Sequence, residues 1–136
     1  MAFVLDASIT ACWAFDDEDH PHARLAFDRM RSEESVVPSL WSFEVRNILI
    51  VSERRGRISE SDTATLLVHL SRLRIRADPV PDERAILRLA RAHRPSVYDA
   101  AYLELAQREG LSLATLDTDL QTAAASEGVA LVSGVA

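Results

Sequence analysis

Short apolar runs that alternate with helical patterns constrain the fold of this chain more than any other feature. Buried strands are expected at 2–6, 35–38, 111–116 and 129–132, with a weaker strand at 75–80. Apolar residues recur at helical spacing over 8–15, 22–30, 40–55, 59–74, 82–92 and 96–109, and a short helix follows Asp117. This alternation is typical of a parallel sheet covered on both faces. The sequence therefore predicts the α/β class.

No composition shift, repeat or Ser/Gly-rich linker divides the 136 residues, so we expect a single domain over 1–136. Hydrophobic residues make up 48% of the chain, enough for a packed core. There is neither a basic-then-apolar leader nor an apolar run of membrane length, and Cys12 is the one cysteine. We expect a protein of the reducing cytoplasm, without an intrachain disulfide and without a membrane partner.

The charge of the chain limits how it could bind an anion. Acidic residues number 21 against 15 basic ones, and the formal net charge is −6. This balance excludes a broad basic surface for nucleic acid, so an anionic substrate needs a local device. All 15 basic residues are arginines. The absence of lysine argues against a receiver-type signalling domain and an aspartyl-nucleophile phosphatase, which normally combine acids with a lysine.

Four acidic residues stand where an α/β fold could bring them together. Asp6 and Asp117 follow expected strands, whereas Glu44 and Asp99 lie in the opening turns of expected helices. In a parallel sheet, ligands bind beyond the carboxyl ends of the strands, where these segments meet. Asp119 is a candidate fifth member of the group.

Each acid also has a structural interpretation. Asp6 and Asp117 are suited to cap helices. Asp99 is placed to close a capping box with Ser96, and Glu44 to complement a helix dipole. Singly, each acid favours the structural interpretation, but their joint placement favours a site.

Acids gathered at one edge need a counter-charge. Two carboxylates about 5 Å apart repel by about 3 kcal/mol at an effective dielectric of about 20, so protons or a cation must relieve them. Because thiolates and histidines are scarce, the all-oxygen set suits Mg²⁺ or Mn²⁺. Such an ion polarises a phosphoryl oxygen and activates water, which predicts phosphodiester hydrolysis.

Four motifs then carry a specific resemblance. They are Val4-Leu5-Asp6-Ala7-Ser8, Phe43-Glu44-Val45-Arg46-Asn47, Val97-Tyr98-Asp99-Ala100-Ala101-Tyr102 and Leu113-Ala114-Thr115-Leu116-Asp117. In order and spacing, the chain resembles PIN-domain ribonucleases and, more narrowly, the VapC toxins of toxin–antitoxin pairs. The resemblance spans nearly the whole chain. It implies a three-layer α/β/α fold with a five-stranded parallel sheet, and an endoribonuclease that depends on Mg²⁺ or Mn²⁺.

The same resemblance assigns roles to individual residues. The family's acidic quartet, which is both catalytic and metal-binding, matches Asp6, Glu44, Asp99 and Asp117. Asp119 matches a less regular acid, which leaves its role open.

Three polar residues are the expected supports of the quartet. Thr115 matches a Ser/Thr beside the last acid, and Asn47 matches an asparagine one helical turn after the glutamate. Ser8 either hydrogen-bonds within the site or caps a helix.

The resemblance also implies a homodimer and a VapB-type antitoxin whose C-terminal segment enters the active-site groove, often with an arginine facing the acids. Arg46, Arg54, Arg55 and Arg57 are candidates to guide RNA phosphates. A solvated helix end explains the last three equally simply. The alternative from a different class is a PIN-like module that binds protein or RNA without cutting, and the complete quartet favours the enzyme.

Overall fold

The computed structural model describes residues 2–15 and 20–132, whose strands form one parallel sheet in the order β3-β2-β1-β4. The strands are β1 (Ala2–Leu5), β2 (Glu34–Pro38), β3 (Ile75–Asp78) and β4 (Ser112–Ala114). Strand β1 lies in the middle, where Val4 pairs with Val36 on one side and with Leu113 on the other. All three of these residues are fully buried, as expected for a sheet covered on both faces.

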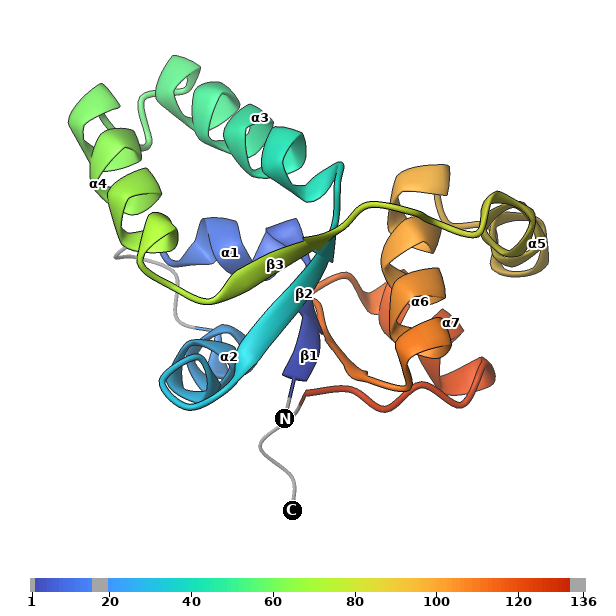
Figure 1. Ribbon diagram of the computed structural model, residues 1–136. Helices are drawn as coiled ribbons and strands as arrows, with labels where there is room; N and C mark the ends of the chain where they lie inside the picture. Colours follow the sequence, from blue (N-terminus) through green and yellow to red (C-terminus); the bar gives the residue numbers. More distant parts are fainter. Residues whose placement is uncertain (1, 16–19, 133–136) are drawn as a thin grey trace.

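Seven helices surround this sheet within the described residues. They are α1 (Ala7–Cys12), α2 (Pro21–Arg29), α3 (Trp41–Arg54), α4 (Glu60–Ser71), α5 (Glu83–His93), α6 (Val97–Glu109) and α7 (Thr118–Ser126). Figure 1 shows α1 to α4 on one side of the sheet and α5 to α7 on the other. The α/β class and its three layers are therefore confirmed.

The expected fifth strand at 129–132 is not formed as a strand in the described part of the chain. Leu131 makes a single parallel bridge to Leu113. The N–H of Leu113 donates to the carbonyl of Ala130, and the N–H of Val132 donates to the carbonyl of Leu113, both at 2.9 Å. The N–H of Val129 instead donates to Ala124 at the end of α7, at 2.8 Å. The N–H of Val129 is thus already bonded to the end of α7, and β4 has only three residues. The pairing between β4 and residues 129–132 is therefore limited to a single bridge.

Local capping chemistry sets several helix boundaries where the sequence predicts them. Ser59 and Asp62 form a reciprocal capping box at the start of α4. Asp82 accepts from the N–H of Ala85 to begin α5, and Ser96 opens α6. Helix α6 ends at Gly110, whose φ of +66° suits a residue without a Cβ.

Helix α1 is shorter than the expected 8–15. It ends at Cys12, and the N–H groups of the next three residues donate to the carbonyls three positions earlier, which tightens the chain into a turn. The indole N–H of Trp13 donates to the carbonyl of Ala23 at 3.0 Å. This contact with α2 turns the chain away from the helix axis.

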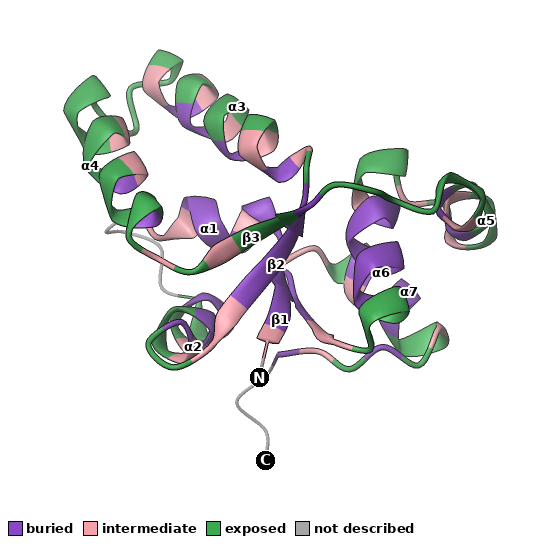
Figure 2. Ribbon diagram, viewed as in Figure 1, coloured by how far each residue is buried: buried purple, intermediate pink, exposed green. Residues whose placement is uncertain are grey.

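Helix α6 is the central helix of its layer. Its residues from Ala100 to Ala106 are all buried, and it packs on β1, β2 and β4. Figure 2 shows this burial against the exposed outer surfaces of α4 and α5. Most of the buried residues are apolar, but Tyr102 and Glu104 bring polar groups inside. None of the described helices is both long and apolar enough to cross a membrane.

Candidate active site

The strand order has a topological switch point between β1 and β4. From β1 the sheet grows to β2 and β3 on one side and to β4 on the other, so the order reverses between β1 and β4. Such a switch point is where ligands bind in parallel sheets. Asp6 follows β1 directly, and Asp117 follows β4 after two residues.

Asp6 is buried, and hydroxyl groups hold its carboxylate in place. Its Oδ2 accepts from Ser8 Oγ at 2.8 Å and from Thr115 Oγ1 at 2.6 Å. Those hydroxyls accept in turn from the backbone N–H groups of Leu116 and Asp117, at 3.2 and 3.1 Å. Each hydroxyl therefore accepts a hydrogen bond from a backbone N–H and donates its own proton to Asp6.

Ser8 and Thr115 thus both contact the first acid. The sequence matched Thr115 only to a residue beside Asp117, and it left a hydrogen bond of Ser8 within the site as one of two interpretations. The cap of α1 shows no side-chain hydrogen bond from Asp6, so its carboxylate is directed to the site and not to the helix. Burial alone raises the pKa of Asp6, and the hydroxyl hydrogen bonds offset part of that rise.

Glu44 reaches the site from the first turn of α3. Its Oε1 accepts from the hydroxyl of Tyr102 at 2.6 Å, which joins α3 to α6. A second link runs from Trp41 Nε1 to Thr10 Oγ1 at 3.1 Å, and Thr10 Oγ1 contacts the carbonyl of Asp6 at 3.3 Å. The helix that carries Glu44 is thus attached to the loop that carries Asp6.

Tyr102 lies within one of the four motifs, but no role for it was predicted from the sequence. A signal was available, because Tyr102 stands three residues after Asp99 and so shares its helix face. Its hydroxyl is the kind of group that needs a partner when buried. What the sequence alone could not supply was the identity of that partner on another helix.

Asp99 lies in the first turn of α6, and Asp117 is the N-cap of α7. Ser96 Oγ accepts from the N–H of Asp99 at 3.0 Å, and Asp117 Oδ1 accepts from the N–H groups of Asp119 and Leu120 at 2.9 and 3.2 Å. Asp117 thus has the capping role that was its structural interpretation. The outer oxygen of a capping carboxylate can still face a ligand.

Mutual repulsion shows that the acids form one electrostatic group. Burial, followed by the charges of Asp6 and Asp99, raises the pKa of Glu44. Burial and the charges of Asp6 and Asp117 raise the pKa of Asp99. The charges of Asp6, Asp99 and Asp117 therefore act on neighbouring members of the group, and a proton or a cation would relieve that repulsion.

The remaining predicted residues are all exposed. Asn47 and Asp119 are exposed, Asn47 on α3 and Asp119 in the first turn of α7. Arg46 donates through Nη1 to the carbonyl and the hydroxyl of Ser42, at 3.0 and 2.9 Å. Arg54 and Arg55 are exposed at the end of α3. Their roles toward a ligand stay predictions.

Within the described ranges, no three acidic, histidine or cysteine side chains are already arranged as a cation cage. The carboxylates nevertheless offer only oxygen donors, which is the chemistry that Mg²⁺ and Mn²⁺ prefer.

The comparisons with known proteins decide the family. Residues 3–126 match the PIN domain. The chain belongs to the PIN-domain family. The resemblance of its four motifs is thereby confirmed.

Individual relatives narrow the placement within the PIN-domain family. Ribonuclease VapC3 of Pyrobaculum aerophilum is 33% identical over 124 residues, which cover 88% of this chain and 92% of the relative. Two crystal structures share the fold. PAE2754 from Pyrobaculum aerophilum matches with a TM-score of 0.70 at 22% identity. The match covers 90% of this chain and 84% of the PAE2754 chain. FitAcB from Neisseria gonorrhoeae has a TM-score of 0.64 at 16% identity, with coverages of 98% and 97%. The chain is a homologue of a VapC-type PIN ribonuclease.

Proposed function

We propose that this PIN-domain protein is an endoribonuclease, the toxin of a type II toxin–antitoxin pair, and that it hydrolyses RNA phosphodiester bonds with Mg²⁺ or Mn²⁺. The family match and the VapC-type relative support this activity. The observation that carries the proposal is that Ser8 and Thr115 hold the buried Asp6 at the switch point, where its charge helps to raise the pKa of Glu44 and of Asp99. Carboxylates that are buried near like charges lower the stability of the fold, so this arrangement favours a functional role over a purely structural one.

The donor set fits a hard divalent cation. Asp6, Glu44, Asp99 and Asp117 would hold it, and the exposed Asp119 is a candidate fifth ligand from the start of α7. When bound, the ion neutralises the acids, polarises a phosphoryl oxygen and makes water a better nucleophile near neutral pH. The raised pKa values mean that the ion competes with protons for the same oxygens.

The chain's own residues position these acids. Ser8 and Thr115 fix Oδ2 of Asp6, so the rotamer of that carboxylate is set before any ligand arrives. Tyr102 fixes one oxygen of Glu44 in the same way and leaves the other available. Asn47, one turn after Glu44, is placed to hydrogen-bond a substrate group at the rim.

We further propose that the partners follow the VapC type. These partners are an RNA substrate, a VapB-type antitoxin and a second copy of the chain, all in the cytoplasm. An acidic site favours an antitoxin segment that brings a guanidinium to the carboxylates, since that charge would replace the cation.

Cleavage of RNA tests the activity. The purified protein should cut total RNA with Mg²⁺ or Mn²⁺ and stop in EDTA, and mapping of the new ends would identify the bond. Cutting that persists in EDTA would contradict the metal-dependent reaction. Absence of cutting with every RNA and ion, by a protein that still binds RNA, would favour the non-cutting module instead.

A further inference from the structure

A short chain of hydrogen bonds joins the first turn of α3 to the turn that carries Asp6. Trp41 Nε1 donates to Thr10 Oγ1 at 3.1 Å, and Thr10 Oγ1 donates to the backbone carbonyl of Asp6 at 3.3 Å. Thr10 is completely buried, and Trp41 is 9% exposed. Since a hydroxyl donates one proton and also accepts, Thr10 serves both neighbours at once. We call these two bonds the Trp41–Thr10 relay.

The relay connects the backbone segments that carry two of the site acids. Trp41 is the first residue of α3, and Glu44 follows three residues later in the same turn. Thr10 stands one turn after Asp6, and its N–H also donates to the Asp6 carbonyl at 3.3 Å. The charge of Asp6 helps to raise the pKa of Glu44, so the two acids are close enough to influence each other.

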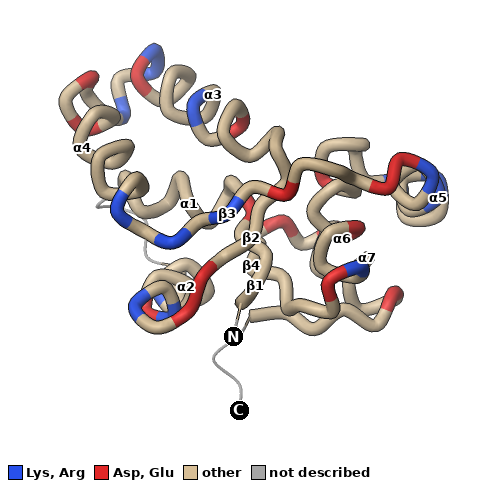
Figure 3. Tube along the Cα trace, viewed as in Figure 1, with Lys and Arg blue, Asp and Glu red and all other residues tan. Residues whose placement is uncertain are grey.

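The relay is a directional contact between two helices that otherwise lack one kind of tie. No ion pair joins α1 to α3, because α1 has no charged side chain, as Figure 3 shows. Apolar packing is non-directional, whereas a hydrogen bond weakens steeply when its angle departs from the preferred range. A buried indole N–H that loses its acceptor is also strongly disfavoured. Movement of the first turn of α3 relative to Asp6 is therefore resisted by the relay.

Divalent cations that bind oxygen ligands differ in how precisely those ligands must be placed. Mg²⁺ requires near-ideal octahedral coordination at about 2.0–2.1 Å, whereas Ca²⁺ accepts flexible arrangements at about 2.3–2.6 Å. A carboxylate that is misplaced by more than about 0.5 Å no longer has productive geometry in a demanding site. Carboxylates that are held in place thus favour Mg²⁺, and carboxylates that are free to move apart favour Ca²⁺.

We propose that Trp41 and Thr10 are positioning residues that set the spacing between the carboxylates of Asp6 and Glu44, and that this spacing selects Mg²⁺ over Ca²⁺. The inference rests on the proposed metal-dependent function. Neither residue is a ligand, because Trp41 acts through the helix that carries Glu44 and Thr10 acts through the Asp6 carbonyl. Tyr102 has a separate task, since its hydroxyl orients one oxygen of Glu44.

Cation binding in the absence of RNA tests the relay separately from cleavage. Mn²⁺ is titrated into the purified protein, the EPR signal of free Mn²⁺ reports occupancy, and Mg²⁺ or Ca²⁺ is then added to displace the bound ion. Trp41→Phe deletes the N–H that begins the relay and should bind Mg²⁺ about tenfold more weakly. Its affinity for Ca²⁺ should stay unchanged, so the preference for Mg²⁺ should fall by the same factor.

The second tryptophan of the chain provides a matched control. The indole N–H of Trp13 donates to the carbonyl of Ala23 at 3.0 Å, and this bond reaches α2, which carries none of the four site acids. Trp13→Phe makes the same chemical deletion and should leave both affinities unchanged. Equal losses of Mg²⁺ affinity in Trp13→Phe and Trp41→Phe would overturn the proposal.

Two variants of Thr10 keep the test valid if Trp41→Phe does not fold. Thr10→Val removes the hydroxyl at nearly the same volume and should lose the preference for Mg²⁺. Thr10→Ser keeps a hydroxyl that can donate and accept, and it should retain the preference. If Thr10→Val binds both ions as the wild type does, or loses affinity for both ions equally, the relay does not select the cation.

RNA cleavage by the same proteins separates this inference from the proposed function. If the wild type binds no ion, the metal-dependent reaction is wrong and the relay proposal fails with it. If the wild type binds Mg²⁺ but Trp41→Phe keeps the same preference, the relay proposal alone is wrong. If Trp41→Phe loses the preference but no RNA is ever cut, the relay proposal stands and the nuclease proposal fails.

Discussion

Helix α6 takes part in two groups of acidic residues that are built in opposite ways. At its start, Asp99 faces Asp6 and Asp117, and burial with like charge raises its pKa. Five residues further on, Glu104 is buried beside Asp78, but Arg108 lies between them. Among the described residues, no basic side chain pairs with the first group, whereas Arg108 pairs with the second.

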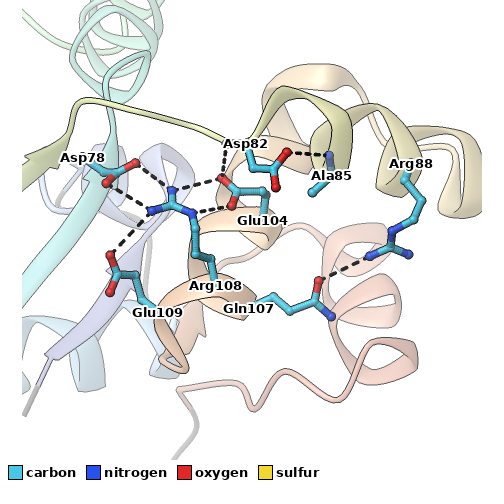
Figure 4. A network of polar contacts seen from close by, with 8 residues as sticks. All are labelled: Asp78, Asp82, Ala85, Arg88, Glu104, Gln107, Arg108 and Glu109. Atoms are coloured by element: carbon cyan, nitrogen blue, oxygen red, sulfur yellow. Dashed lines mark hydrogen bonds and ion pairs between the residues drawn. The ribbon is translucent and has the colours of Figure 1, made fainter.

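The second group is shown in Figure 4. Arg108 donates through Nε and Nη2 to both oxygens of Glu104 at 2.6 and 3.1 Å, and through Nη1 and Nη2 to Asp78 at 3.4 and 2.8 Å. The N–H of Asp82 adds a bond to Glu104 at 3.4 Å. This network ties the end of β3 and the start of α5 to α6, so its purpose is the fold. The acids of this second group are neutralised within the chain, whereas the proposed function assigns a cation to those at the switch point.

The largest expected effect comes from neutralising an acid of the first group. Asp6→Asn should lower the rate of RNA cleavage by about a thousandfold or more, because it removes a ligand that no other group replaces. The thermal midpoint of the metal-free protein should not fall, since the variant loses a buried charge whose pKa burial raises. A large loss of stability would show that Asp6 serves the fold.

The second group should respond in the opposite way. Arg108→Met leaves the carboxylates of Asp78 and Glu104 without their cation and should lower the free energy of unfolding by about 3 kcal/mol, measured in urea. The exposed Arg84 on α5 is the control, and Arg84→Gln should change stability by less than about 0.5 kcal/mol. Arg108→Met that unfolds like the wild type would contradict the structural role of the network.

A smaller effect is expected where a neutral group orients an acid. Tyr102→Phe removes the 2.6 Å bond to Glu44 and should slow cleavage by about tenfold while the fold is kept, because the carboxylate gains rotamer freedom. Tyr98→Phe deletes the same hydroxyl from an exposed residue of the same helix and should leave the rate unchanged. Equal cleavage rates in the two variants would show that the Tyr102 hydroxyl does not orient Glu44 for the reaction.

The dependence of stability on pH gives the smallest effect, with opposite signs in different regions. Hydrogen bonds from His93, then Gln107 and Arg88, lower the pKa of Glu127 to about 2. Its contribution to stability is therefore present above its ordinary pKa near 4.5 and lost as the pH falls toward 2. Glu127→Gln should flatten this acid limb in urea melts, and an unchanged limb would contradict the assignment.

The site acids have raised pKa values, so their ionisation costs stability in the folded state. That cost is fully present above their folded pKa values and is relieved as the pH falls toward the ordinary carboxyl range. Metal-free wild type should therefore gain stability on mild acidification from neutral pH, before the loss at Glu127 begins. Asp6→Asn should gain less. A monotonic loss in both proteins would contradict the repulsion.

The sequence predicted what depends on local chemistry and on the rules of parallel sheets. Ser59, Asp82, Ser96 and Gly110 mark helix ends because caps act within one turn of their own residue. The positions of Asp6 and Asp117 after strands, and of Glu44 and Asp99 in opening helix turns, were predicted in the same way. These inferences needed no knowledge of which elements touch.

What escaped prediction depends on contacts between distant segments. Tyr102 on α6 bonds Glu44 on α3, and Arg108 on α6 bonds Asp78 on β3. The local sequence pattern around each residue does not indicate which distant segment it contacts. The fifth strand failed for a similar reason, since the helix end competes for the N–H of Val129.

Thermal unfolding with and without a divalent cation tests the central claim most directly. Mn²⁺ or Mg²⁺ should raise the midpoint of the wild type in a concentration-dependent way, because the ion binds the folded state and relieves its repulsion. Asp28→Asn, a surface control on α2, should show the same shift, and Asp6→Asn should show little or none. Equal shifts in all three proteins, or no shift in the wild type, would contradict a cation shared by these acids.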